Sequence, residues 1–439
     1  NVAKAMMPKK ESQHFLIKES LNGKERWMNL DFGCEYDAFR AEVSDFCSEH
    51  KGVQLTGNLF GRYETIKKSR SSNSDGKTMS LAEWQILLIE NGYFARNIPK
   101  QYGGYGGDLD IVKNVIINTE FSKAGIPCAT GGQGIDFLVP TLLEMGTDEQ
   151  KDHYIKSALH LETIWCQGYS EPNAGSDLAS LQTKGVLEGD EWVINGQKIW
   201  TSTAKYSQMM FCLVRTEPDE PKHKGISYLL IPMDTPGIEI RPLVDMTLDA
   251  GFNEVFFTDV RIPATNIVGK RGEGWLVANK TLVHERGSLG DPDKMITRLN
   301  LLIALMKNET MNGERVIDHP VFRDRLMKIQ GKTLALKAHG LRLLSANLNK
   351  GQDVDLGIMI VKLFGTEMRY ELEALAIDVM GELGTLYEES PHIRDAGSWQ
   401  YAFMYYLGLI IGGGTSQIQK NIISERGLGM PRAPKIKEA

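Results

Sequence analysis

The succession of hydrophobic patterns predicts an α+β protein with an N-terminal all-α domain, a middle β-barrel or sandwich domain and a C-terminal helical domain. Apolar residues recur three and four apart in the outer parts, as in helices, and roughly every second residue in the middle, as in strands. The strands follow one another without intervening helices, which excludes a parallel-sheet fold. No Gly-x-Gly-x-x-Gly motif opens a strand–helix unit, which excludes a dinucleotide-binding fold. We place the domains at 1–161 (1–28 being an extension), 162–270 and 271–439.

The N-terminal part contains recognisable helix starts. Residues 36–47 and 110–121 have amphipathic spacing. Ser80 with Glu83, and Thr147 with Gln150, have the capping-box spacing in which each side chain bonds the other's backbone N–H. These signals predict helices that begin directly after Ser80 and Thr147.

The middle part has short β-favouring runs separated by Pro and Gly. Asn195-Gly196 lies between such runs within 192–200, which predicts a hairpin turn there. Further strands are expected at 209–214, 226–231, 238–241 and 253–258.

The helical period returns in the C-terminal part. A helix is expected at 275–286, after which Gly287, Gly290 and Pro292 should break or kink it. Long helices are expected at 320–349, 355–384 and 397–411, and a last one near Thr415.

Charge and composition narrow the class of protein. A net charge of −6 and a pI near 5.9 argue against nucleic acid as a partner, and the basic segment 67–77 reads as a solvated loop. The five cysteines form no Cys-x-x-Cys pair, so we expect a reduced, cytoplasmic protein. No apolar run is long enough for a membrane span. His153 and His160 lack a third ligand, so no metal site is expected.

One motif is more specific than any other. The stretch 165–177, with its Ser-Glu-Pro-Asn-Ala-Gly-Ser-Asp core, and the following Trp200-Thr-Ser202 resemble the middle domain of flavin-dependent acyl-CoA dehydrogenases. The resemblance extends from about residue 31 to 432. It implies a C-terminal four-helix bundle, FAD as cofactor, an acyl-CoA substrate oxidised to a trans-2-enoyl-CoA, an electron-transfer flavoprotein as acceptor, and a homotetramer or dimer.

The resemblance also assigns roles to residues of this chain. Trp200 would cover one face of the flavin, although a Trp taken alone is more often core, and Ser202 would reach N5 beside Thr201. Thr415 and Gln417 would meet the cofactor at a helix N-terminus, although Thr415 is also a plain N-cap. The flavin pyrimidine edge would bind Gln167, Tyr169 and Ser170, and CoA would bind Ser176. The FAD of a neighbouring subunit would contact Asp378, Gly381 and Glu382. Its pyrophosphate would bind an arginine, for which Arg315, Arg323 and Arg325 are alternative candidates.

The catalytic base departs from the commonest pattern of that family. The glutamate expected before Gly-Thr in the last domain is replaced by Gly413, which cannot take a proton. Isovaleryl and long-chain members place the base before an arginine on the first helix after the β-domain, which corresponds here to Glu285 and Arg286. Glu285 is therefore the predicted base, against the simpler reading of a surface carboxylate. Gly413 keeps an N–H that can bond the thioester carbonyl.

Two alternatives remain open from the sequence. A chain without the usual glutamate suits a redox-silent partner subunit of a hetero-oligomeric dehydrogenase. A flavin oxidase or monooxygenase on the same scaffold is the other. The acyl group is not specified, although the consecutive glycines 412–414 leave space for a bulky or branched one.

Overall fold

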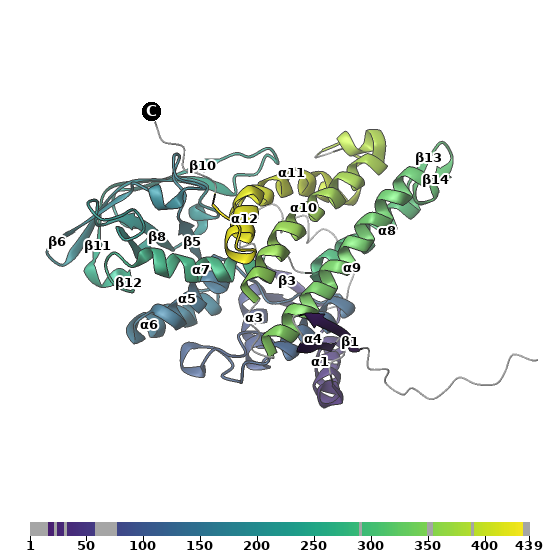
Figure 1. Ribbon diagram of the computed structural model, residues 1–439, viewed down its shortest axis with the longest axis horizontal. Helices are drawn as coiled ribbons and strands as arrows, with labels where there is room; N and C mark the ends of the chain where they lie inside the picture. The colour runs from purple at the N-terminus through teal and green to yellow at the C-terminus, as the bar shows by residue number, and fades with distance from the viewer. Residues whose placement is uncertain are drawn as a thin grey trace, which may run out of the picture.

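The computed structural model describes residues 16–21, 24–29, 33–57, 77–288, 292–348, 354–387 and 390–432. Figure 1 shows a β-domain on one side, long C-terminal helices on the other, and the N-terminal helices beneath both. The predicted order of helical, β and helical parts is therefore confirmed. The basic segment predicted as a loop lies, up to residue 76, outside the described residues. No helix in the described ranges has both the length and the apolar character to cross a bilayer.

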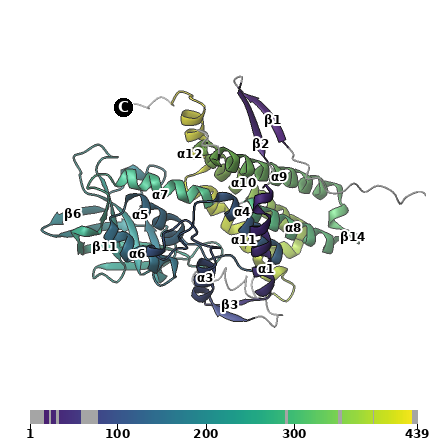
Figure 2. The ribbon, with the colours of Figure 1, turned by 90° about the horizontal axis from the view of Figure 1, so that it is seen from below.

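The N-terminal helices pack around aromatic residues, with Phe46, Trp84 and Phe121 buried together. Both predicted capping boxes are present: Ser80 with Glu83 opens α3, and Thr147 with Gln150 opens α6. A short hairpin, β1 and β2, contacts α9 (Figure 2). The elements are β1 (Leu16–Leu21), β2 (Lys24–Asn29), α1 (Asp37–Glu49), β3 (Gln54–Thr56), β4 (Thr78–Ser80), α3 (Leu81–Glu90), α4 (Ile111–Ala124), the π-helical turn η3 (Gln133–Leu138), α5 (Val139–Met145) and α6 (Asp148–Leu159).

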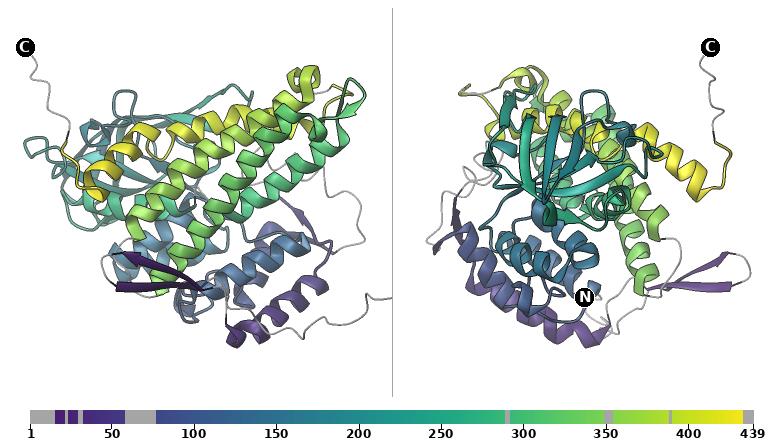
Figure 3. Two further views of the ribbon diagram at one scale, coloured as in Figure 1. Left: turned by 45° about the vertical axis from the view of Figure 1, so that its right-hand side comes forward. Right: turned by 90° about the vertical axis from the view of Figure 1, so that its left-hand side faces the viewer.

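The middle part is one eight-stranded sheet in the order β10-β11-β7-β6-β8-β9-β12, with β5 paired in parallel to β8. Figure 3, right, looks onto this sheet. Both faces of β8 and β9 are buried, which explains their continuous apolar runs. The strands are β5 (Trp165–Gly168), β6 (Lys184–Glu188), β7 (Glu191–Lys198), β8 (Met209–Arg215), β9 (Ile226–Pro232), β10 (Ile238–Leu243), β11 (Phe252–Pro263) and β12 (Ile267–Val268).

The hairpin turn predicted at Asn195-Gly196 is wrong. Both residues lie inside β7, and the turn between β6 and β7 falls instead at Gly189 and Asp190. The partner strand β11 shifts register between Phe257 and Val260, opposite this point. Asn195 makes two hydrogen bonds with Asp259 in the shifted segment. Asn195 Nδ2 donates to the Asp259 carboxylate at 3.0 Å, and the Asp259 backbone N–H donates to Asn195 Oδ1 at 2.9 Å. The pair therefore marks a β-bulge, another irregularity for which these residues are suited.

The C-terminal part is a helical bundle in which α9 and α10 run side by side (Figure 3, left). The break predicted after residue 286 separates α7 from α8. Within the bundle, α10 contacts α8, α9 and α11. The elements are α7 (Gly274–Ser288), α8 (Pro292–Asn308), β13 (Thr310–Met311), β14 (Glu314–Arg315), α9 (Pro320–Leu348), α10 (Val354–Met380), η8 (Gly381–Thr385), α11 (Ser398–Ile411) and α12 (Ser416–Ile422).

A buried ionic network joins three helices of this bundle. Glu373 of α10 is fully buried and accepts two hydrogen bonds from Arg298 of α8, at 2.8 and 2.6 Å. Arg369, one turn earlier on α10, donates a third at 2.5 Å. The Arg298 guanidinium also lies 3.5 Å from the ring centre of Trp399 on α11. A charge so deeply buried is tolerated only because it is fully paired.

Glu373→Leu should lower the free energy of unfolding by about 3–5 kcal/mol, because two arginines lose their buried counter-charge. Glu371→Leu, two residues earlier on α10, removes an exposed pair with Lys332 and should cost no more than about 1 kcal/mol. Urea unfolding followed by circular dichroism compares the two. Equal losses in both variants would contradict this view of the network.

Candidate active site

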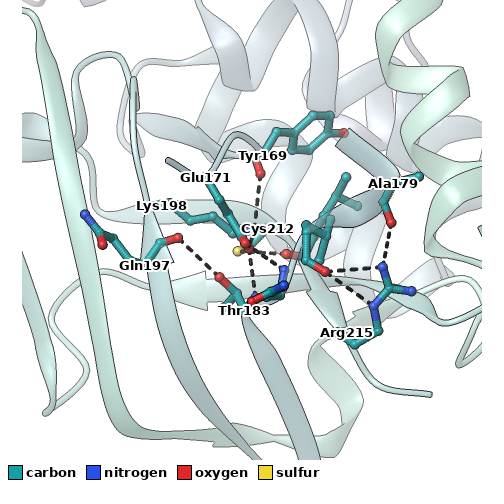
Figure 4. A network of polar contacts seen from close by, with 11 residues as sticks. Tyr169, Glu171, Ala179, Thr183, Gln197, Lys198, Cys212 and Arg215 are labelled. Carbon is teal, nitrogen blue, oxygen red and sulfur yellow. Dashed lines mark hydrogen bonds and ion pairs between the residues drawn. The ribbon is translucent and has the colours of Figure 1, made fainter. Parts of the chain in front are cut away.

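A buried ion pair ties together the two motif segments found in the sequence. Lys198, at the end of β7, is fully buried, and its Nζ lies 2.8 Å from Oε1 of Glu171. The same ammonium group donates to the carbonyl of Tyr169 at 3.2 Å, and Ile199 N–H donates to the carbonyl of Ser170 at 2.9 Å. Figure 4 shows Glu171 and Lys198 at the centre of this network. The segments 169–171 and 198–200 are thereby held side by side.

The Glu171 carboxylate is kept charged by its partners. Burial alone would raise its pKa, but the Lys198 ammonium and hydrogen bonds from Thr183 and the Gln182 backbone lower it further than burial raises it. The backbone N–H groups of Gln182 and Thr183 donate to its two oxygens at 2.6 and 2.8 Å. The pair thus also fixes the chain leading into β6.

Trp200 follows this anchored segment and is not part of the core. Its side chain is 60% exposed, and its backbone has a φ of 59°, a left-handed conformation that is strained for a bulky residue. Thr201 is held by Asn253 through a 3.0 Å backbone bond and a 2.9 Å bond from Asn253 Nδ2. A large aromatic face held rigidly at a surface is suited to stacking on a flat ligand.

Some of the buried polar atoms that lack a hydrogen-bond partner lie in or beside the segments that were assigned to the cofactor, and others lie elsewhere in the described chain. Among the described residues, Thr201 Oγ1, Ser416 Oγ and Gln419 Oε1 are buried and lack a hydrogen-bond partner. Buried polar groups are ordinarily satisfied, so these atoms are available to bond a ligand or a water molecule. Thr415 is the N-cap of α12, accepting from Ile418 N–H at 3.1 Å, and Gln417 is exposed on the first turn.

The glycine turn before α12 is held by hydrogen bonds from a buried lysine of α10. Gly413 and Gly414 have φ values of 63° and 89°, which glycine adopts at little cost. Fully buried Lys362 donates to the carbonyls of Gly414 at 2.6 Å and Ile410 at 3.4 Å. Gln419 Nε2 donates to the Gly413 carbonyl at 3.1 Å. Within the described part of the chain, the Gly413 N–H has no acceptor, so it is available to a ligand.

Helix α7 is where the three parts of the protein meet, since it contacts β9, η3 with α5, and α10. Buried Thr281 meets Thr141 of α5, with their hydroxyl oxygens 3.0 Å apart. Leu276 and Val283 mark its exposed face. At about 100° per residue, position 285 lies about half a turn around the helix from Leu276 and Val283. It follows Thr281 by about one turn, on the side of α7 where Thr281 is buried. The structure describes the helical backbone at Glu285 and Arg286 but not their side chains.

The remaining predicted site residues occupy several places. Asp378 lies in the last turn of α10, where its carboxylate pairs with Arg325 at 2.7 Å, and Gly381 and Glu382 follow in η8. Arg315 pairs with Asp318, whereas Arg323 is exposed. Tyr169 is buried, Gln167 and Ser170 are half-buried, and Ser176 is exposed. Sequence reasoning missed Lys198, Glu171 and Lys362. Among the described residues no cluster of metal-ligating side chains occurs.

Comparison with known proteins identifies the family. Profiles of the N-terminal, middle and C-terminal domains of acyl-CoA dehydrogenases match residues 65–162, 166–260 and 272–428. The chain belongs to the acyl-CoA dehydrogenase family. It is therefore an oxidoreductase of a flavin-dependent family, and the resemblance seen in its motifs is confirmed.

Several acyl-CoA dehydrogenases are similar over most of their length. The protein named IpdE1 from Mycobacterium tuberculosis is 36% identical over 399 residues, covering 90% of this chain and 99% of that protein. The IpdE1 of Mycolicibacterium smegmatis is 36% identical, covering 91% and 99%. A solved ChsE4-ChsE5 complex from Mycobacterium tuberculosis has a chain that is 30% identical, with a TM-score of 0.73 and coverage of 92% and 100%. A structure described as the Tcur3481-Tcur3483 steroid ACAD is 28% identical, with a TM-score of 0.73 and coverage of 92% and 100%.

Lys198→Met should lower the free energy of unfolding by about 3–5 kcal/mol at neutral pH, because Glu171 loses its buried cation. The pKa of Glu171 is lower in the folded protein than in the unfolded chain, where it is about 4.3. The ion pair therefore stabilises the fold fully above about pH 4.3, and this stabilisation is lost as the pH falls through the lower pKa of the folded protein. The difference in free energy of unfolding between the wild type and Lys198→Met should therefore become smaller as the pH falls below about 4.3. Urea unfolding at a series of pH values measures it.

Lys222→Met is the matched control for this prediction. Its partner Asp177 is exposed, so we expect a loss of no more than about 1 kcal/mol. Adding Glu171→Gln to Lys198→Met should recover part of the loss, because no unpaired charge then remains. A double variant as unstable as Lys198→Met alone would contradict the assignment.

Proposed function

We propose that this chain is an FAD-dependent acyl-CoA dehydrogenase that oxidises a thioester to its trans-2-enoyl-CoA, with Glu285 as the base. The observation that carries the proposal is the placement of position 285 on the inner side of α7, at the junction of the three domains. The rival position, Gly413, has no side chain to take a proton. A surface carboxylate would instead be expected on the side of Leu276 and Val283.

The residues present fit FAD. Trp200 offers an exposed aromatic face, and Ser202 lies two residues further along the same anchored segment. The buried, unpartnered oxygens of Thr201, Ser416 and Gln419 are acceptors or hydroxyl donors suited to a flavin's polar edge and side chain. When bound, FAD supplies the acceptor for the hydride that leaves C3 of the substrate. The remaining cofactor contacts proposed are those of Gln167, Tyr169, Ser170, Asp378, Gly381, Glu382, Thr415 and Gln417.

The chain's own groups account for the acidity of the substrate. Gly413 N–H, which has no acceptor among the described residues, donates to the thioester carbonyl and stabilises the negative charge that develops on it. Lys362 holds the carbonyls on either side of this turn and so fixes the direction of that N–H. Glu285 then takes the proton from C2. Arg286 and Ser176 are proposed to bind the CoA part.

The substrate proposed is a bulky acyl-CoA, such as a steroid-derived thioester. Two considerations support this. Solved relatives of 27–28% identity are described as steroid ACADs. The turn at 412–414 also carries no side chain beside the proposed carbonyl site, which leaves room for a wide acyl group.

A second candidate is a subunit of a hetero-oligomer in which the partner chain carries the chemistry. The observation that favours it is the ChsE4-ChsE5 complex, in which two different chains assemble. The visible spectrum of the chain purified alone separates the two cases. Bound flavin that is bleached by an acyl-CoA supports the enzyme, whereas a colourless chain supports the silent subunit. An electron-transfer flavoprotein is the proposed electron acceptor, and rapid reoxidation by air would instead favour an oxidase.

Glu285→Gln should retain FAD and lower the rate of flavin bleaching by acyl-CoA by about 10²–10⁴-fold, because the amide cannot take the C2 proton. Stopped-flow absorbance measures the rate. Glu273→Gln, directly before α7, is the control and should bleach normally. Normal bleaching in Glu285→Gln would refute its assignment as the base.

Trp200→Ala should leave the stability of the cofactor-free protein within about 0.5 kcal/mol, because the side chain is exposed. It should weaken FAD binding by at least about tenfold, because a stacking face is lost. Fluorescence titration of the apoprotein with FAD gives the Kd. Tyr206→Ala, which removes another exposed aromatic residue of the same domain, should leave that Kd unchanged.

A further inference from the structure

A carboxylate outside the predicted site is set into an unusual turn. Asp136 lies in η3, a π-helical turn, a rare conformation that occurs often at functional sites. Gly132 N–H donates to its Oδ2 at 2.9 Å. A Cβ at Gly131 would lie 2.4 Å from the same oxygen, so only glycine leaves room for the carboxyl group in this position.

The surroundings of Asp136 are those of a group lining a cavity. Its side chain is accessible to solvent, yet burial by the surrounding protein raises its pKa, and the Gly132 N–H and Lys294 of α8 offset this only in part. Asp136 lines a cavity of about 360 Å³ between the loop after α3, α4 and the η3–α5 wall. The lining is mixed: Ile117, Val139 and Leu143 are apolar, whereas Arg96, Asn114, Asn118 and Asp136 are polar or charged. Ligand sites commonly combine apolar walls with a few placed polar groups.

The wall that carries Asp136 is also the wall against which α7 packs. Both η3 and α5 contact α7, and Thr141, five residues after Asp136, meets Thr281. Position 285 lies one turn beyond Thr281. Asp136 therefore lies on the element that packs directly against the helix carrying position 285.

An apolar tail would be poorly matched to this carboxyl group. It would remove water from Asp136 and return no hydrogen bond, which penalises binding. A hydroxyl group avoids this in either protonation state, since it donates to a carboxylate and accepts from a carboxylic acid.

We propose that Asp136 is a specificity-determining residue whose carboxyl group hydrogen-bonds a hydroxyl on the acyl tail. The substrate class is then a hydroxylated acyl thioester. This inference rests on the proposed function with Glu285 as the base, and it further takes the acyl chain to run from position 285 along η3 into the cavity beside Asp136.

The test measures binding separately from turnover. In the Glu285→Gln background, calorimetry gives the Kd of ω-hydroxyacyl-CoAs of graded length, each against the acyl-CoA of equal carbon number. For the length that reaches Asp136, the hydroxylated thioester should bind at least about tenfold tighter, and Asp136→Leu should abolish or reverse that preference. Asp136→Asn should retain it. Asp152→Leu, on the exposed side of α6, is the matched control and should leave it unchanged.

A probe that needs no substitution guards against misfolding of the variants. The ω-methoxy analogue of the preferred length can accept but cannot donate, so a carboxylate at Asp136 should bind it at least about tenfold more weakly than the hydroxyl compound, whereas a carboxylic acid should bind both more tightly than the plain thioester. Equal Kd values for plain, hydroxylated and methoxylated thioesters, with wild-type flavin still bleached, would overturn this inference alone. Failure of every acyl-CoA to bleach wild-type flavin would overturn the proposed function, and this inference with it.

Discussion

The pairing of Lys198 with Glu171 is the constraint on which the geometry of the candidate site depends. It joins a strand end to a segment 27 residues earlier and simultaneously fixes the carbonyl of Tyr169 and the N–H groups that enter β6. Trp200 is largely exposed and strained, and its edge-to-face contact with Phe252, with ring centres 6.1 Å apart, contributes little to holding it in place. The rigid segment before it supplies the free energy that holds this conformation.

The second constraint is the position of α7. A helix that contacts the sheet, the N-terminal helices and α10 cannot move relative to one of them without disturbing the others. The hydroxyl contact between Thr281 and Thr141, and the contacts of Glu144 with Lys280 and His284, fix both its rotation and its distance from α5. A base on such a helix would be placed by the packing of all three domains rather than by one flexible loop.

Much of the fold could be predicted from the sequence because its signals are local. Capping boxes at Ser80 and Thr147, and the break near Pro292, depend on residues within one or two turns. The Asn195-Gly196 turn was mispredicted because the same dipeptide suits a bulge, and the choice depends on the distant strand β11. The Glu171–Lys198 and Arg298–Glu373 pairs have no sequence signal, since they join residues that only the tertiary fold brings together. For Asp136, Gly131 and Gly132 earlier in the same loop were a signal, but their meaning could be read only once the cavity was known.

The hydrogen bonds from Lys362 to the glycine turn before α12 have a consequence for how such a protein evolves. Because Lys362 holds the backbone carbonyls of Ile410 and Gly414, the path of the turn is fixed on both sides of position 413 by a side chain that lies outside the turn. That position can lose an acidic residue without loosening the peptide group beside it. In the proposed mechanism, proton removal and carbonyl polarisation belong to different elements, so the group that removes the proton can change its location while the carbonyl site stays where it was.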